Sequence, residues 1–146
     1  MAADFETVYT VTDFWDGIRA GIADFNGAPH YYERPFDEQK DDWTEFFLLK
    51  RIDEETFRLA MEDWEIWKRW YIACQIGETT IETHPALPED RARHREITEI
   101  LSERLVVNPS LDVKAQAEFE RDYRDIHPKH ATNPMAKLKV KWQVIS

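Results

Sequence analysis

Two patterns of apolar and polar positions predict β-strands: apolar runs rich in β-branched and aromatic residues near the N-terminus, and alternation with a period of two near the C-terminus. Within the first 52 residues, runs rich in β-branched and aromatic residues are separated by turn residues. These runs predict four strands: Phe5–Asp13, Ile18–Phe25, Ala28–Phe36 and Trp43–Arg51. We expect them to form an antiparallel four-strand meander.

Two glycines refine the expected N-terminal sheet. Asn26-Gly27 predicts a tight two-residue turn between the second and third strands, because such a turn needs positive φ at both central positions. Gly21, inside the second strand, predicts a bulge or a close approach of another part of the chain.

Near the C-terminus, apolar and polar residues alternate with a period of two. This alternation runs through Leu111–Phe119 and again through Leu138, Val140, Trp142 and Val144. Alanine and lysine in the first run favour a helix, but its strict period of two favours a strand. We therefore expect an antiparallel C-terminal hairpin with a long polar loop over residues 125–134, in which Glu118 and Glu120 face Lys139 and Lys141.

Between these regions the apolar spacing changes to three or four residues, which predicts helices. The first spans residues 53–76, with Asp53 as N-cap, and holds half of the six tryptophans of the chain. Because its apolar arc is wide, we expect this central Trp-rich helix to pack on the sheet, with its tryptophans as the bulk of the core. A connection over residues 77–87 leads to a second helix over residues 88–105, with Pro88 in its first turn.

The predicted fold class is therefore α+β: a four-strand antiparallel meander (1–52), two helices, and C-terminal strands (111–146) that join the sheet. At 146 residues, with 42% hydrophobic and 13% aromatic residues, the chain has the size of a single domain with one real core. It lacks the basic and apolar regions of a signal peptide, has one cysteine and has no apolar run of the ~20 residues that span a bilayer. We expect a cytoplasmic protein without membrane association.

The net charge of −10 lies entirely in residues 1–63, since residues 64–146 hold equal numbers of acidic and basic residues. Such a surface repels a phosphate backbone, which argues against nucleic-acid binding. It can steer a basic protein partner, or it can serve only solubility and the protection of a sheet edge. The candidate acidic interaction face is the loop that holds Asp37, Glu38, Asp41 and Asp42. This loop lacks the alternating ligands and central glycine of a calcium loop, so we expect no metal there.

Asp63 interrupts the apolar arc of the first helix, where it falls between Trp67 and Trp70. One interpretation is a structural carboxylate that accepts hydrogen bonds, because a buried carboxylate needs partners. The other is a carboxyl group with a perturbed pKa at the floor of an aromatic pocket, a candidate acid, base or cation site. An ordinary or depressed pKa with a large loss of stability in Asp63→Asn favours the first interpretation. A raised pKa with stability largely kept favours the second.

Two histidine combinations are candidates for chemistry: His30 with Glu33, and His84 with His94 across a proline-rich segment that can converge with Asp63 on one cleft. The candidate pocket residues are Asp63, Trp67, Trp70, His30, Glu33, His84 and His94. No zinc-ligand spacing, phosphate-binding glycine loop or nucleophile motif occurs, so we expect no metal and no cofactor, and catalysis is disfavoured.

Three functional hypotheses remain open. The first is a non-enzymatic interaction module, of the adaptor, inhibitor or immunity type, that binds a basic protein through the acidic N-terminal half. The second is a small-molecule or cation binder, or a hydrolase, with a Trp-lined pocket around Asp63. The third is a structural homodimer formed through a sheet edge or tryptophan surface.

Overall fold

The chain forms two compact units in the computed structural model, which describes residues 4–14, 17–121 and 137–145. The barrel unit comes from Met1–Ile52 and Val106–Ser146, and the helical unit from Asp53–Leu105. The α+β class is confirmed. In the sequence, the helical unit lies between two strands of the barrel unit.

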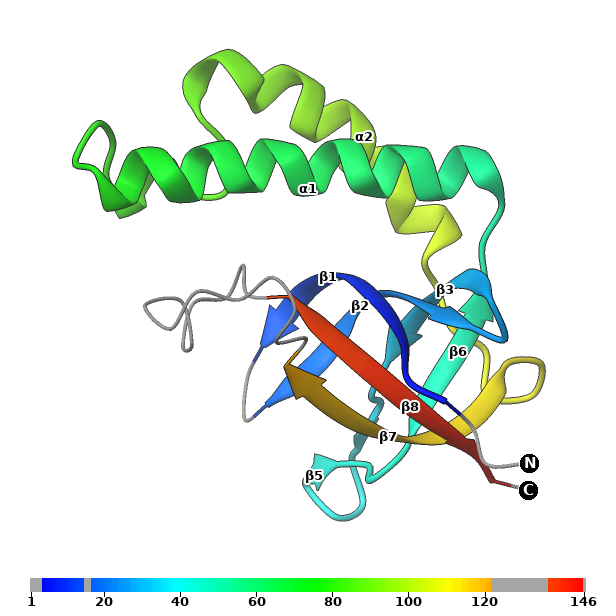
Figure 1. The fold of residues 1–146 in the computed structure, drawn as a ribbon. Coiled ribbons are helices and arrows are strands. Elements are labelled where there is room, and N and C mark those ends of the chain that lie inside the picture. The colour runs from blue at the N-terminus through cyan, green and yellow to red at the C-terminus, as the bar shows by residue number, and fades with distance from the viewer. Residues whose placement is uncertain (1–3, 15–16, 122–136, 146) are drawn as a thin grey trace. The chain divides into compact units, whose positions relative to one another are not determined.

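Six strands form the barrel unit (Figure 1). They are β1 (Glu6–Phe14), β2 (Ile18–Phe25), β3 (Ala28–Glu33), β6 (Phe47–Arg51), β7 (Val113–Arg121) and β8 (Leu138–Val144). Each strand pairs antiparallel with the next in this order, and β8 pairs back with β1, Glu6 lying opposite Val140. The sheet therefore closes, which corrects the expectation of an open meander extended by a hairpin. The closed barrel leaves none of these six strands as the free edge on which the homodimer hypothesis relied.

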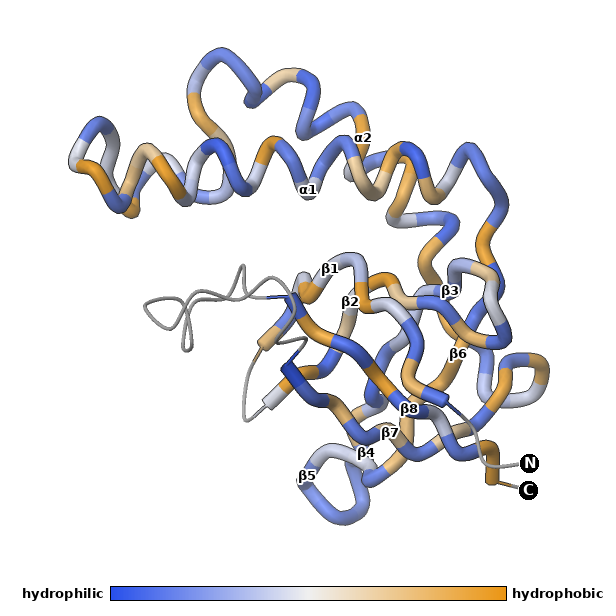
Figure 2. Tube along the Cα trace, viewed as in Figure 1, coloured by the Kyte–Doolittle hydropathy of each residue, from blue (hydrophilic) through white to orange (hydrophobic). Residues whose placement is uncertain are grey.

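Aromatic side chains fill the barrel. The rings of Tyr32, Phe47, Phe119 and Trp142 contact one another, with centroids between 5.8 and 5.9 Å apart. Figure 2 shows the alternation of apolar and polar residues along β8 that directs one face of the strand to this core. The expectation that the tryptophans of the central helix form the bulk of the sheet's core is wrong, because the strands supply their own aromatic core.

The predicted turn and close approach both occur in the barrel. Asn26 and Gly27 have φ of 53° and 78°, as a two-residue turn requires. Their backbone N–H groups donate to the Glu6 carboxylate at 3.1 and 2.7 Å, which ties the turn to β1. At Gly21 the Tyr32 hydroxyl passes close to the backbone and donates to the Thr10 carbonyl oxygen at 2.8 Å.

The predicted fourth strand is broken. Its first residue, Trp43, belongs to β5 (Asp42–Trp43), which pairs with β4 (Phe36–Asp37) in a separate two-stranded hairpin, and only Phe47–Arg51 joins the barrel as β6. The Trp43 ring lies edge-on to Phe36, with centroids 4.9 Å apart, and 3.6 Å beneath the Arg19 guanidinium. These two contacts attach the hairpin to β2 through Arg19.

The C-terminal strands pair in the predicted register. Glu118 lies opposite Lys141 and Glu120 opposite Lys139, with carboxylate–ammonium distances of 4.0 and 3.9 Å. The polar loop expected over residues 125–134 lies outside the described residues.

The helical unit contains α1 (Glu54–Gln75), η1 (Ile81–Thr83), η2 (Pro88–Asp90) and α2 (Arg91–Arg104). Asp53 caps α1 as predicted, because its side chain accepts from the Thr56 N–H at 2.8 Å. Within this unit α2 packs against α1 (Figure 1), and Ile66 and Ile97 are almost fully buried. Neither helix is long and apolar enough to cross a membrane, a finding that covers the described residues.

Candidate functional site

Asp63 and His94 form a hydrogen-bonded pair between the two helices. Asp63 projects from α1 and His94 from α2, and Nδ1 of the imidazole lies 2.6 Å from Oδ1 of the carboxylate. A carboxylate can only accept, so His94 donates from Nδ1 and its Nε2 remains for another partner. Each side chain keeps 22% of its surface exposed, so the pair is neither sealed in the core nor fully solvated.

The Asp63 carboxyl group lies in an unusual electrostatic environment. Burial raises its pKa above the ordinary value of 3.8, and the negative charge of Glu62 adds to the rise. The hydrogen bond and charge of His94 act in the opposite direction but do not cancel the desolvation. Asp63 therefore combines a raised pKa with one side-chain hydrogen-bond partner among the described residues, His94.

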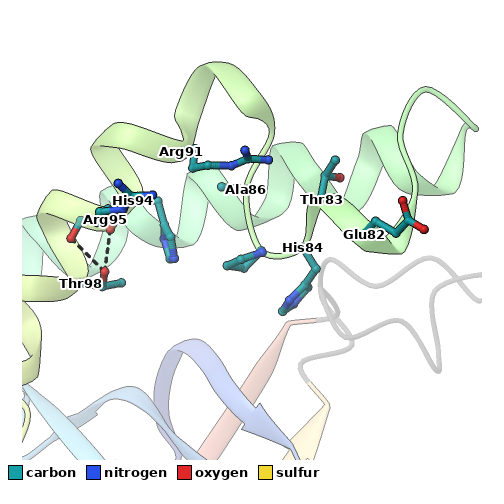
Figure 3. Close-up of a pocket in the computed structure, with 9 residues that line it drawn as sticks. Glu82, Thr83, His84, Ala86, Arg91, His94, Arg95 and Thr98 are labelled. Carbon is teal, nitrogen blue, oxygen red and sulfur yellow. Dashed lines mark hydrogen bonds between the residues drawn. The ribbon is translucent and has the colours of Figure 1, made fainter.

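A hollow of about 420 Å³ lies beside this pair (Figure 3). One wall is the connection at residues 82–86, and the other is the first half of α2. The α2 residues that line it are Arg91, His94, Arg95 and Thr98. They stand at positions i, i+3, i+4 and i+7, so they share one face of the helix.

Trp70 holds the connection in place under the hollow. Its ring is 5% exposed, and its Nε1 donates to the Thr83 hydroxyl at 2.9 Å. The Thr83 hydroxyl in turn donates to the Thr80 carbonyl at 2.8 Å, which closes the η1 turn. The His84 ring packs edge-on to Trp70, with centroids 4.7 Å apart. Figure 3 shows the His84 and His94 rings projecting to the same side of the helical unit.

The hollow offers acid–base groups but no free hydroxyl nucleophile. The Thr98 hydroxyl lies 2.9 Å from the His94 carbonyl and 3.0 Å from that of Arg95, and the Thr83 hydroxyl is bound as described above (Figure 3). Among the described residues no group of three or more His, Cys, Asp and Glu side chains is arranged to hold a metal ion. The arrangement can therefore bind a ligand or exchange a proton with it through His94.

The structure brings together only part of the predicted pocket. His84 and His94 line the hollow, Asp63 is connected to it through its hydrogen bond to His94, and Trp70 packs against His84. Trp67 does not line this hollow. Instead Trp67 stacks between Trp64 and Tyr71, with centroids 5.0 and 5.2 Å away.

The other predicted pair belongs to the barrel unit and does not line the hollow. His30 is buried on β3, where its Nδ1 lies 2.8 Å from the Ala28 carbonyl and its ring lies edge-on to Phe25. Glu33 accepts from the Tyr31 hydroxyl at 2.8 Å. These local contacts account for both side chains.

The candidate acidic face is the β4–β5 hairpin. Asp37 accepts from the backbone N–H groups of Gln39 and Lys40 at 3.0 and 3.3 Å, and Asp42 from that of Trp43 at 2.7 Å. These two carboxylates therefore stabilise the hairpin itself. Glu38 and Asp41 are exposed and have no such role.

Sequence reasoning missed the two arginines of the hollow. Arg91 and Arg95 flank His94 on the face of α2 that lines the hollow, a polar stripe with helical spacing. The helical period of 3.6 places Arg91 and Arg95 on the same face as His94, so this spacing was the signal in the sequence that identifies them.

Comparison of the chain with protein-family models, with curated protein sequences and with solved structures finds no match. Function is therefore inferred from the geometry of the hollow and of the β4–β5 hairpin.

Proposed function

We propose that the protein binds a small molecule in the hollow of its helical unit, which is the second hypothesis from the sequence. The observation that carries this proposal is the meeting of His84 and His94 at one hollow, with Asp63 orienting the His94 ring. The volume of the hollow, about 420 Å³, lies within the range of roughly 300–1,000 Å³ typical of ligand sites.

Binding is favoured over covalent catalysis because the lining has no available hydroxyl nucleophile. The hydroxyl groups of Thr83 and Thr98 are both engaged in hydrogen bonds within the protein. His94 has the geometry of an acid–base group, since its ring is held by a carboxylate on one side. That geometry equally suits a hydrogen bond to a ligand, which requires nothing further from the site.

The test is a fragment screen by ¹H–¹⁵N NMR on the 146-residue chain. We expect bound fragments to shift the amide signals of residues 82–98, and His84→Ala to weaken their binding. Glu99→Gln is the control, because Glu99 is exposed on α2 and does not line the hollow. Shifts that cluster on the barrel strands, or equal effects of the two variants, would refute the proposal.

A second candidate function is contact with a basic protein through the β4–β5 hairpin, which was the first hypothesis from the sequence. It is favoured by one observation: within the described residues, none of Asp37, Glu38, Asp41 and Asp42 forms an ion pair. Their negative charge is therefore not neutralised within the part of the chain described.

A fluorescent oligolysine peptide tests this second candidate. The double variant Glu38→Gln/Asp41→Asn removes two exposed charges, and asparagine tolerates the positive φ of 51° at position 41. We expect weaker binding than for the control Glu99→Gln/Glu103→Gln, and a difference that shrinks as salt is added. An equal loss of peptide affinity in both double variants would mean that the peptide is held only by general charge attraction, and would refute a specific contact at the hairpin.

A further inference from the structure

The charge of the hollow indicates which chemical group it accepts. Arg91 and Arg95 both line it, on either side of His94 along α2. Across the described residues neither arginine has an ion pair or a side-chain hydrogen bond. Both side chains are exposed and line the same hollow, so each can attract an anion that enters it.

The carboxylates around the hollow are already engaged with other cations. Asp90 binds Arg69 through two contacts of 3.0 and 3.1 Å. Glu62 binds Arg93 at 2.5 and 2.8 Å, and Glu96 binds Arg93 as well. Asp63 is hydrogen-bonded to His94. Arg91 and Arg95 form no ion pair within the described residues, although Glu82 lines the same hollow.

Glu82 is the one acidic side chain in the lining. Figure 3 shows its carboxylate at the end of the hollow away from His94, while the Arg91 side chain extends from α2 towards Ala86. Both arginines therefore project from α2, and the carboxylate of Glu82 stands at the end of the hollow away from His94.

We infer that the hollow binds an oxyanion, the phosphate or carboxylate group of a small molecule, through the guanidinium groups of Arg91 and Arg95 beside the His94 ring. This inference rests on the proposed function, because it names the chemical class of the ligand for the same hollow. The planar guanidinium group matches both oxyanions, since its N–H groups can donate to two oxygens at once. The Nε2 atom of His94 adds a third polar group on the same face of α2.

The experiment titrates inorganic phosphate and, separately, acetate into the ¹⁵N-labelled 146-residue chain at constant ionic strength set with sodium chloride. We expect saturable shifts of the amide signals in residues 82–98. Saturation with phosphate alone identifies a phosphoryl group as the ligand chemistry, saturation with acetate alone identifies a carboxylate, and either supports the inference.

Variants separate a specific site from general attraction. Arg91→Gln and Arg95→Gln should each weaken binding of the effective anion by about ten-fold or more, as loss of a charge-assisted hydrogen bond does. Glu82→Gln should strengthen it. Arg58→Gln is the matched control, because Arg58 is exposed on α1 and lies outside the lining, and it should leave binding unchanged.

Three outcomes would overturn the inference: no saturation with either anion, shifts outside residues 82–98, or an equal loss in Arg58→Gln and Arg91→Gln. The fragment screen distinguishes its failure from that of the proposed function. Neutral fragments that bind the hollow while both anions fail would leave the binding function standing with a different ligand class. If neutral fragments and anions all fail, both are wrong.

Discussion

The close approach at Gly21 gives the sharpest prediction about the barrel. A Cβ atom at this position would lie 2.1 Å from the Thr10 carbonyl oxygen and 2.5 Å from the Tyr32 hydroxyl oxygen. Both distances are far below van der Waals contact. Tyr32 is fully buried, so its hydroxyl cannot move aside into solvent, and Thr10 O is backbone within β1. Gly21→Ala must therefore displace β1 and the Tyr32 ring together.

The expected magnitude has two parts. Overpacking of a well-packed core typically costs about 1–3 kcal/mol. Displacement of the Tyr32 ring also breaks its hydrogen bond to Thr10, and a buried group left without its partner costs about 1–3 kcal/mol more. Gly21→Ala should thus lower the free energy of unfolding by about 2–6 kcal/mol, whereas Tyr32→Phe should lower it by about 1–3 kcal/mol.

Urea unfolding of the two single variants and the double variant measures both parts. The hydrogen bond is lost in each single variant. The loss of unfolding free energy in the double variant should therefore be smaller than the sum of the two single losses, by about 1 kcal/mol or more. Gly17→Ala is the control, because nothing lies within 4 Å of its added Cβ and only its φ of 100° is unfavourable. A loss below about 1 kcal/mol for Gly21→Ala, or strict additivity in the cycle, would refute the reasoning.

Three further predictions concern the helical unit and the C-terminal strands. The pKa of Asp63 is raised in the folded protein, so its contribution to stability is fully present below the unfolded pKa near 3.8 and is lost as pH rises through the folded pKa. Asp63→Asn removes this titration, so the free energy of unfolding of the variant should rise relative to that of the parent as the pH increases above 3.8, as measured by urea unfolding at a series of pH values. Parallel pH dependences of the two unfolding free energies would contradict the raised pKa. Trp70→Phe removes the buried donor to Thr83 and part of the ring, and should destabilise the protein by about 1–3 kcal/mol in chemical denaturation, while a loss below about 0.5 kcal/mol would mean that the contact is unimportant. Glu118→Lys places a like charge opposite Lys141 and should cost about 0.2–1 kcal/mol more than Glu118→Gln, a difference that added salt should reduce; a salt-independent difference would point to packing instead.

Local patterns predicted most of the secondary structure because the relevant forces act between near neighbours. Residue type and turn residues located β1 and β2, and the period of two located β7 and β8, each within about two residues. Asp53 marked the start of α1 through its side-chain cap. The Asn26-Gly27 turn followed from the positive φ that both residues adopt. The opposed charges of Glu118 and Lys141 indicated the register of the last two strands.

The break in the predicted fourth strand is a feature that local sequence patterns do not predict. Phe36 and Trp43 pack on each other, and Arg19 covers the Trp43 ring from β2. That contact joins residues far apart in the chain, and it draws β5 out of the barrel into its own hairpin. No period within residues 43–51 contains this information, since it depends on where Arg19 lies in the folded sheet.

The candidate site was predictable only in part for the same reason. A carboxylate inside an apolar helical arc and two histidines around a proline segment could be recognised from spacing. That Asp63 meets His94, 31 residues away, depends on how α2 packs against α1. Which arginines stay unpaired depends on which carboxylates the same packing assigns to Arg69 and Arg93.

The sequence by itself determined the elements of this protein: strands at both ends, two helices between them, and their caps and turns. Only the tertiary structure decided that the strands close through the pairing of β1 with β8, that the barrel fills with its own aromatic rings, and that a hollow forms beside Asp63 and His94. The physical reason is range. Propensity, capping and periodicity act over a few residues, whereas closure, packing and ion pairing select among partners distant in the chain, and all of the elements together set that choice.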